Sequence, residues 1–156
     1  MPVFRTRRRV RHSAQAMFDL VADVEKYPAF VPLCVALKVR KRAVDAQGAQ
    51  VLTADMEIGY RAIREKFTSR VTLDAANMQI LVEYIDGPFS HMENRWSFVA
   101  DPADARCCTV EFFIDYAFRS RTFTLLMGSL FDTAFRKFAG AFEARADAVY
   151  GTGRSG

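Results

Sequence analysis

The sequence predicts an α+β fold in which one long C-terminal helix lies across a curved antiparallel sheet. Three observations lead to this fold class. Residues 120–150 carry apolar side chains at helical spacing. Most of the preceding chain alternates apolar and polar residues, as half-buried strands do. Short turn-like connections between those segments favour antiparallel pairing, so we expect a sheet of about six to seven strands.

Residues 3–11 are predicted to form the first strand, because alternate side chains there share a face. Ser13 is a suitable N-cap for a short helix over residues 14–23. The next segment, 27–34 (YPAFVPLC), is strongly apolar, but its two prolines prevent a regular helix. We interpret this segment either as a buried connection or as the rim of a pocket.

The middle of the chain alternates apolar and polar residues in six further segments, which are interrupted by turn-forming residues such as the Asp-Gly-Pro of positions 86–88. Strands are predicted at 35–44, 49–60, 61–73, 78–85, 90–99 and 106–118. In the first of these, Val35 is expected to point inward with Leu37 and Val39. Glu65 falls in phase with the inward apolar residues of its strand, where it needs water, a ligand or, more commonly, an arginine partner.

The last predicted element is a helix over residues 122–150. Its apolar residues recur at steps of three and four, so their side chains share one face. Ser120 or Thr122 can cap its start, and Gly151 suits its end. Burial of each phenylalanine is worth about 1.5–3 kcal/mol, so another layer must cover this face. The apolar stripe consists of Phe123, Leu126, Met127, Leu130, Phe131, Ala134, Phe135, Phe138, Ala139, Phe142, Ala146 and Val149.

Length and composition indicate one globular domain at residues 1–151, followed by a disordered tail at 152–156. No apolar run approaches the ~20 residues of a transmembrane helix, and the start of the chain lacks the apolar core of a secretory signal. The three cysteines are an odd number without a CxxC motif. This cysteine usage favours a reducing cytoplasm.

The net charge of +4 is concentrated in residues 1–12, which hold five arginines and no acidic residue. Such a local patch suits an anionic surface, either phospholipid headgroups or RNA. Charge on an exposed edge strand can equally serve solubility alone. The candidate surface-binding residues are Arg5, Arg7, Arg8, Arg9 and Arg11.

The sequence shows no pattern of catalytic or metal-ligating residues. His12 and His91 are the only histidines, and no second ligand stands at metal spacing from either. There is no GxSxG motif and no P-loop. Residues 151–156 match GxGxxG, but no strand precedes them and no helix follows, so we reject a dinucleotide site. We therefore expect no catalytic residues, no metal and no cofactor.

The inward side chains include many large flexible or aromatic residues, which is typical of an apolar ligand pocket. A solid core of the same composition is the alternative. We assign the deeper lining of a pocket from alternation along the strands and from the phase of the helical stripe. These candidates are Met56, Ile58, Tyr60, Phe67, Trp96, Phe112, Ile114, Tyr116, Leu130, Phe131 and Phe135.

Several segments together resemble one known family. They are 21–34 (VADVEKYPAFVPLC), 54–60 (ADMEIGY), 64–71 (REKFTSRV), 86–89 (DGPF), 96–98 (WSF) and the phenylalanine, isoleucine and tyrosine at 112, 114 and 116. The pattern resembles the coenzyme Q-binding branch of the polyketide cyclase/START-like (SRPBCC) superfamily, over nearly the whole chain. The YPxFxPxC segment is its most specific part.

The resemblance implies a helix-grip fold with a hydrophobic tunnel between sheet and helix. It implies non-enzymatic binding of ubiquinone or a similar isoprenoid lipid, as a carrier or chaperone that supports respiratory electron transport. Tyr27, Phe30, Val31, Pro32 and Leu33 would lie near the tunnel mouth. In that function the arginines would make transient contact with an anionic membrane. Together with the cysteine usage, this predicts a cytoplasmic protein that is at times peripheral at the inner membrane.

The same branch includes RatA-like ribosome association toxins, so a second reading remains open. The arginines would then bind ribosomal RNA phosphates, and binding would weaken steeply with salt. A cyclase-type enzyme with Glu65 or Tyr60 as acid or base is a third reading, which the fold permits without deciding. The sequence leaves the oligomeric state and the length of the lipid tail open.

Overall fold

A computed structural model describes residues 3–151 of the chain, so the predicted tail at 152–156 lies outside the described residues. One antiparallel sheet has the strand order β1-β7-β6-β5-β4-β3-β2. The strands are β1 (Val3–Val10), β2 (Cys34–Val44), β3 (Gln50–Tyr60), β4 (Ile63–Asp74), β5 (Gln79–Asp86), β6 (Phe89–Ala100) and β7 (Cys108–Phe118). The helices are α1 (Ala14–Ala22), the 3₁₀ helix η1 (Val24–Ala29) and α2 (Arg121–Tyr150). The predicted α+β helix-grip fold is confirmed.

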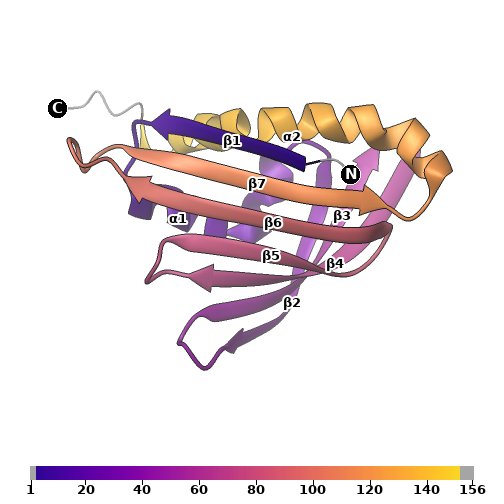
Figure 1. The fold of residues 1–156 in the computed structure, drawn as a ribbon, viewed down its shortest axis with the longest axis horizontal. Coiled ribbons are helices and arrows are strands. Elements are labelled where there is room, and N and C mark those ends of the chain that lie inside the picture. Colours follow the sequence, from indigo (N-terminus) through magenta and orange to yellow (C-terminus); the bar gives the residue numbers. More distant parts are fainter. Residues whose placement is uncertain (1–2, 152–156) are drawn as a thin grey trace.

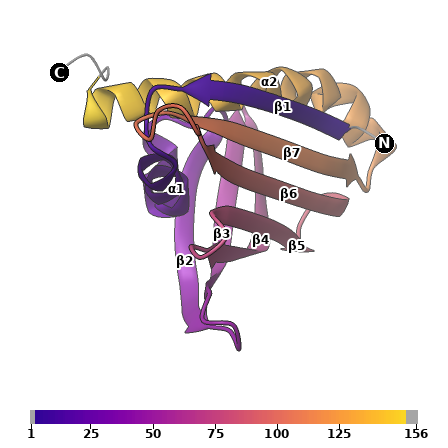
Figure 2. The ribbon, with the colours of Figure 1, turned by 60° about the vertical axis from the view of Figure 1, so that its left-hand side comes forward.

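The sheet is strongly curved. β6 and β7 run along α2, whereas β2, β3 and β4 turn away from that direction (Figures 1 and 2). The edge strands β1 and β2 are joined by the crossover that contains α1 and η1. The buried side chains of the sheet, α1 and α2 form one continuous apolar core. The core therefore lies on the inner side of the curved sheet, beneath α2.

The ends of α2 follow the predicted capping chemistry. The Ser120 hydroxyl accepts a hydrogen bond from the backbone N–H of Phe123, at 3.1 Å. At the other end Gly151 has a φ of +88°, and its N–H donates to the Asp147 carbonyl at 2.9 Å. Both caps agree with the predictions from sequence, and the helix begins one residue earlier than predicted.

Two residues of the predicted apolar stripe on α2 are exposed. Leu126 is 66% exposed and Val149 is 51% exposed. Leu126 stands nine residues before Phe135, and nine steps of about 100° place it half a turn around the helix from that buried ring. Val149 has the phase of the stripe but lies in the last turn of α2. The prediction that these two residues join the core is therefore wrong.

The inward orientation predicted for Val35 is also wrong, since this side chain is 43% exposed. The register between β2 and β3 shifts between Cys34 and Ala36. A one-residue irregularity reverses which face a side chain points to. Cys34 is consequently buried, Val35 turns outward, and Leu37 returns to the inner face as a half-buried residue.

The three cysteines, Cys34, Cys107 and Cys108, are all buried and free. Burial raises the pKa of the Cys34 thiol to about 11, and it raises the pKa of the Cys108 thiol to about 11 as well.

Among residues 3–151, no helix combines the length and the apolar character that crossing a membrane requires.

Candidate functional site: an apolar cavity under the long helix

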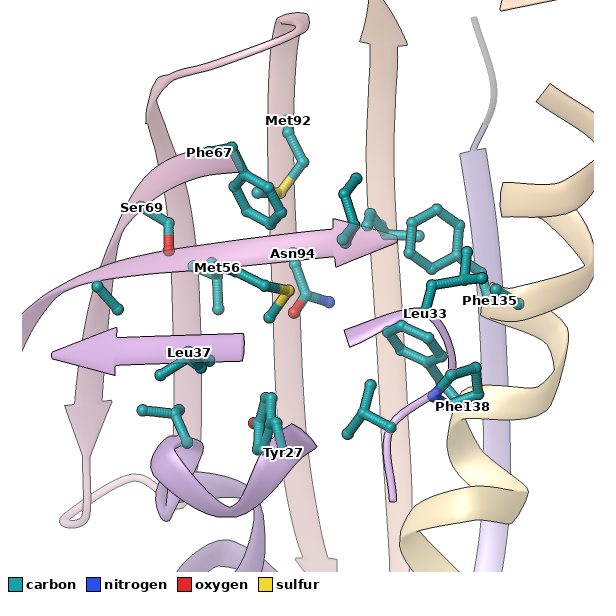
Figure 3. A pocket seen from close by; sticks show the side chains of 18 of the residues that line it. Tyr27, Leu33, Leu37, Met56, Phe67, Ser69, Met92, Asn94, Phe135 and Phe138 are labelled. Atoms are coloured by element: carbon teal, nitrogen blue, oxygen red, sulfur yellow. The ribbon is translucent and has the colours of Figure 1, made fainter. Parts of the chain in front are cut away.

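A cavity of about 90 Å³ lies between α2 and the inner face of the sheet. Its walls come from η1, the segment that follows it, β2 to β7 and α2. Most of the predicted lining residues meet there: Tyr27, Val31, Pro32, Leu33, Met56, Ile58, Phe67, Trp96, Ile114, Phe131 and Phe135. Among residues 3–151, no charged side chain lines the cavity. Besides the Tyr27 and Trp96 rings, the polar side chains of this described lining are Ser69 and Asn94, which are labelled in Figure 3.

The structure adds lining residues that the sequence analysis did not select. They are Val24, Leu37, Ala54, Ser69, Val71, Val82, Phe89, Met92, Asn94, Ala134, Phe138 and Phe142. Alternation along the strands is enough to predict that the two polar residues of this set, Ser69 and Asn94, point inward. Ser69 lies midway between the inward residues Phe67 and Val71, and Asn94 lies two residues before Trp96. A polar residue in phase with an apolar face was the available signal.

Two predicted lining residues on β7, Phe112 and Tyr116, are buried but do not reach the cavity. The ring of Phe112 packs edge-on against Trp96, with centroids 4.8 Å apart. The ring of Tyr116 packs against Phe135 at 5.0 Å, and burial raises the pKa of its phenol to about 12. Neighbouring aromatic rings therefore cover both, and Ile114 between them is the inward residue that faces the cavity.

Three further predicted lining residues lie elsewhere. Phe30 packs edge-on against Phe142, with centroids 5.0 Å apart, and so supports the cavity wall from behind. Tyr60 ends β3 and is 38% exposed, because no strand continues beyond it. Leu130 stands five residues before Phe135, which turns it about 140° around α2 and away from the cavity. Phe30, expected near the tunnel mouth, and Leu130, expected in the lining, therefore border no cavity described in this section, whereas Tyr60 lines only the smaller cavity described below.

Asn94 is held in one orientation inside the cavity. Its side-chain N–H₂ donates to the Phe113 carbonyl at 2.9 Å, and its side-chain oxygen accepts from the Trp96 indole N–H at 2.9 Å. The carbonyl can only accept and the indole can only donate, so these partners fix which end of the amide is nitrogen. One N–H of Asn94 remains without a protein partner among the described residues.

Ser69 supplies the second polar group. This residue on β4 is only 5% exposed, and its hydroxyl forms no hydrogen bond within residues 3–151. Among the described residues, the fully buried side-chain polar atom that lacks a partner is the Tyr84 hydroxyl. The Ser69 hydroxyl therefore still faces the open space of the cavity, where it can bond to water or a ligand. Ser69 and Asn94 together offer two hydrogen-bond donors inside an otherwise apolar space.

The segment after η1 forms one wall and is clamped in place. The Tyr27 hydroxyl donates to the Val21 carbonyl at 2.5 Å, and burial raises the pKa of this phenol above its usual range. Leu33 has a φ of +69°, and its carbonyl accepts from the Gly59 N–H on β3 at 3.0 Å. The Tyr27 hydroxyl is therefore occupied by a structural hydrogen bond, and the Leu33–Gly59 bond holds the wall against the sheet.

A second, smaller cavity of about 10 Å³ adjoins the first and shares Leu33, Ile58 and Phe131 with it. Its outer walls are the β3–β4 hairpin and the first turns of α2, through Tyr60, Ile63, Phe123 and Met127. We call this space the mouth. Glu65 also lines the mouth, and the arginine partner expected for it is absent from the ion pairs of residues 3–151.

The N-terminal arginines are largely engaged with neighbours. Arg7 pairs with Glu111, Arg8 with Glu143 and Arg9 with Asp101. The guanidinium of Arg5 lies 4.6 Å from the centre of the Phe113 ring. No ion pair of Arg11 is found in the described part of the chain. Their predicted binding to an anionic surface stays a prediction, and three of the five charges are already compensated.

Residues 10–143 match the family model described as polyketide cyclase / dehydrase and lipid transport. The chain is 33% identical over 141 residues to the ribosome association toxin RatA of Escherichia coli K12, which covers 90% of this chain and 84% of that protein. It is 30% identical over 143 residues to the mitochondrial coenzyme Q-binding protein COQ10 homolog B of Xenopus laevis. That match covers 89% of this chain and 55% of that protein.

Solved structures show the same fold. The solution structure of an 18 kDa protein from Caulobacter crescentus has a TM-score of 0.77 at 30% identity, covering 97% of this chain and 99% of that one. The Zhui aromatase/cyclase from a Streptomyces species has a TM-score of 0.75 at 17% identity, covering 94% and 93%, and speaks for the fold alone. Family model, relatives and fold agree: the chain belongs to the polyketide cyclase / dehydrase and lipid transport family.

Proposed function

We propose that this protein binds ubiquinone or a similar isoprenoid quinone in its apolar cavity, and carries or chaperones it in support of respiratory electron transport. The observation that carries the proposal is the composition of the cavity lining. Apolar side chains surround two hydrogen-bond donors, Ser69 and Asn94, and no charged side chain takes part. A ligand for such a site is neutral, largely apolar and equipped with acceptor oxygens.

A quinone ring meets these requirements. Its carbonyl and alkoxy oxygens accept hydrogen bonds and donate none, so they complement the Ser69 hydroxyl and the remaining N–H of Asn94. Lipids with a carboxylate or phosphate are poorer candidates, because a buried anion needs a cationic partner. The lining provides none.

Burial of the isoprenoid tail against the same apolar lining would favour binding by about 0.8 kcal/mol for each buried CH₂ group. A cavity of about 90 Å³ suits a ring-sized group. A long tail would therefore extend through the mouth, past Phe131 and Met127, or widen the cavity as it enters. The first turns of α2 are the element that would have to yield.

The relatives support a binding role. One is named as a coenzyme Q-binding protein, and neither curated relative described above carries the name of an enzyme. The cavity lining also offers no acid–base pair, since its one phenol, on Tyr27, is held by the Val21 carbonyl. We accordingly propose a non-enzymatic carrier without a cofactor, in the cytoplasm, with transient contact at the inner membrane.

The test is a titration of the purified protein with ubiquinone in detergent micelles, followed by the quenching of Trp96, the single tryptophan, which lines the cavity. Replacing Phe131 with Asp introduces a charge into the cavity and should abolish binding. Replacing Thr133 with Asp adds the same charge on the exposed face of the same helix and should leave binding intact. Equal binding by a folded Phe131→Asp variant would refute the proposal.

A second candidate function is association with the ribosome as a RatA-like toxin or regulator of translation. The observation in its favour is the 33% identity to RatA across 84% of that protein. Co-sedimentation with ribosomes over a salt series tests it. Binding that persists at moderate salt and is lost when all five N-terminal arginines become Gln supports this function. An absence of co-sedimentation at low salt rejects it.

A further inference from the structure

We propose that the end of the molecule that carries the mouth is a docking surface for an anionic phospholipid membrane. The docking patch consists of Leu125, Leu126, Arg61, Lys66, Arg119 and Arg121. Its leucines would insert among the lipids, and its cations would contact the headgroups. This inference rests on the proposed function, because it names the surface through which a membrane-dissolved quinone would reach the cavity.

The two leucines are the most exposed large apolar side chains of α2. Leu125 is 86% exposed and Leu126 is 66% exposed, and both lie within the first two turns of the helix. Single exposed apolar residues are ordinary, but two large neighbours on one protruding turn are not explained by packing within the chain. Insertion of such side chains into the lipid interface removes them from water.

Four cations lie at the same end of the sheet as the leucines, and two of them, Lys66 and Arg119, line one groove with Leu126. Arg61 lies in the β3–β4 hairpin, Lys66 lies near the start of β4, and Arg119 and Arg121 flank the start of α2. None of the four forms an ion pair within residues 3–151, in contrast to Arg7, Arg8 and Arg9 on β1. The Arg119 guanidinium is held in place through the Phe89 carbonyl, at 3.0 Å.

Three acidic side chains, Glu57, Glu65 and Asp86, lie at the same end of the sheet, and Glu57 stands opposite Lys66 in the β3–β4 register. Against the four cations of the patch they leave a positive balance of one charge. A positive rim around apolar side chains complements the negative surface of a membrane that contains anionic lipids. It complements a neutral protein surface less well. We therefore infer that the partner of the patch is an anionic lipid surface.

The patch is continuous with the cavity. Lys66, Arg119, Phe123 and Leu126 line an open groove on the surface. Phe123 also lines the mouth. Phe131, two turns further along α2, lines both the mouth and the main cavity. Phe123 thus connects the groove to the mouth, and Phe131 connects the mouth to the cavity, at the end of the sheet where β7 passes into α2 (Figure 1).

Sedimentation with vesicles tests the proposal. The vesicles contain phosphatidylcholine with about one third phosphatidylglycerol, at low and at high salt. The double variant Leu125→Asp/Leu126→Asp should bind at least about tenfold more weakly than the wild type. Val44→Asp/Val149→Asp is the matched control, since it places the same two charges on exposed apolar positions at the opposite end of the molecule. The control should bind within about threefold of the wild type.

The charges are tested separately with Lys66→Gln/Arg121→Gln. This variant should lose at least about fivefold in vesicle binding at low salt, and the difference should shrink at high salt. Equal vesicle binding by wild type and the leucine variant, or equal losses in the leucine variant and its control, would overturn the docking surface. So would binding of the wild type to ribosomes without any binding to vesicles.

The outcome is separable from that of the quinone titration, which is carried out in detergent without vesicles. A wild type that binds quinone in micelles but no vesicles contradicts the docking surface and leaves the proposed function standing. A wild type that binds vesicles through the patch but takes up no quinone supports the docking surface and contradicts the proposed function.

Discussion

The Trp96 indole N–H donates a hydrogen bond to the side-chain oxygen of Asn94, across 2.9 Å and two positions of the same strand. This bond satisfies a buried indole and at the same time aims an amide into the cavity. The Phe113 carbonyl holds the other end of the amide. A polar group in an apolar cavity is thereby fixed in place before any ligand arrives, which lowers the cost of binding.

Replacing Asn94 with Leu should weaken both folding and ligand binding. The Trp96 N–H would lose its partner inside the core, which should lower the free energy of unfolding by about 1–3 kcal/mol. The lost donor should reduce quinone affinity about tenfold. Urea unfolding and the micelle titration measure the two effects.

Ser69→Ala is the companion variant, because Ser69 lines the cavity and the structure shows no hydrogen bond from its hydroxyl within residues 3–151. It should reduce quinone affinity by about fivefold and change the free energy of unfolding by less than about 1 kcal/mol. Unaltered affinity in both variants would show that the two donors do not contact the ligand.

Filling the cavity should separate ligand binding from stability. Ala134 is buried on α2 and lines the cavity, so Ala134→Leu directs a larger apolar side chain into the empty space. The free energy of unfolding should change by no more than about 1–3 kcal/mol, the usual cost of overpacking a core. Quinone affinity should fall at least about tenfold, because the side chain occupies the space of the ligand. Ala144→Leu, on the exposed side of the same helix, is the control. Retained uptake in Ala134→Leu would mean that the ligand lies elsewhere.

The sequence predicted the architecture well because the strongest signals were periodic. The caps at Ser120 and Gly151 and the burial of Phe131 and Phe142 all follow from local rules. Val35 was misplaced because a bulge depends on the neighbouring strand, which local alternation does not report. Leu126 was misplaced because steps of three and four drift around a helix over several turns.

The cavity was harder to predict than the core. Alternation places Phe112, Ile114 and Tyr116 on one face, but only the structure shows that Trp96 and Phe135 cover the first and the last. Which inward residues border empty space depends on how side chains from distant strands fit together. Asn94 was within reach, since it is a polar residue in phase with an apolar face.

The turn between β5 and β6 should tolerate no side chain at Gly87. This residue has a φ of +144°, and an added Cβ would lie 2.5 Å from the Phe67 Cβ and 2.9 Å from the Phe67 Cα. Gly87→Ala should lower the free energy of unfolding by about 2–3 kcal/mol. It should also displace Phe67 and weaken quinone binding, as measured by the micelle titration.

Gly48→Ala provides the comparison. Gly48 has a φ of +84°, but an added Cβ would meet nothing within 4 Å. Only the backbone preference is lost, so the cost should be about 1 kcal/mol. Equal costs at the two positions would contradict the close approach of Gly87 to Phe67.

Stability should decline at alkaline pH through the buried thiols. Burial raises the pKa of Cys34 and of Cys108 to about 11, against about 8.5 in an unfolded chain. Because the folded pKa is the higher one, the protonated thiols contribute to the free energy of unfolding. That contribution is complete below about pH 8.5 and is lost as the pH rises through about 11. Urea midpoints across this range should fall, and they should fall less in Cys34→Ala. An unchanged pH dependence in that variant would mean that Cys34 does not contribute.

The most direct measurement is organic extraction of the purified, natively expressed protein, followed by mass spectrometry of the extract. Binding of an isoprenoid quinone in the cavity predicts a stoichiometric quinone in the extract, absent from the Phe131→Asp variant and present in Thr133→Asp. A protein that yields no quinone, and that also fails to take up added ubiquinone, would contradict the account.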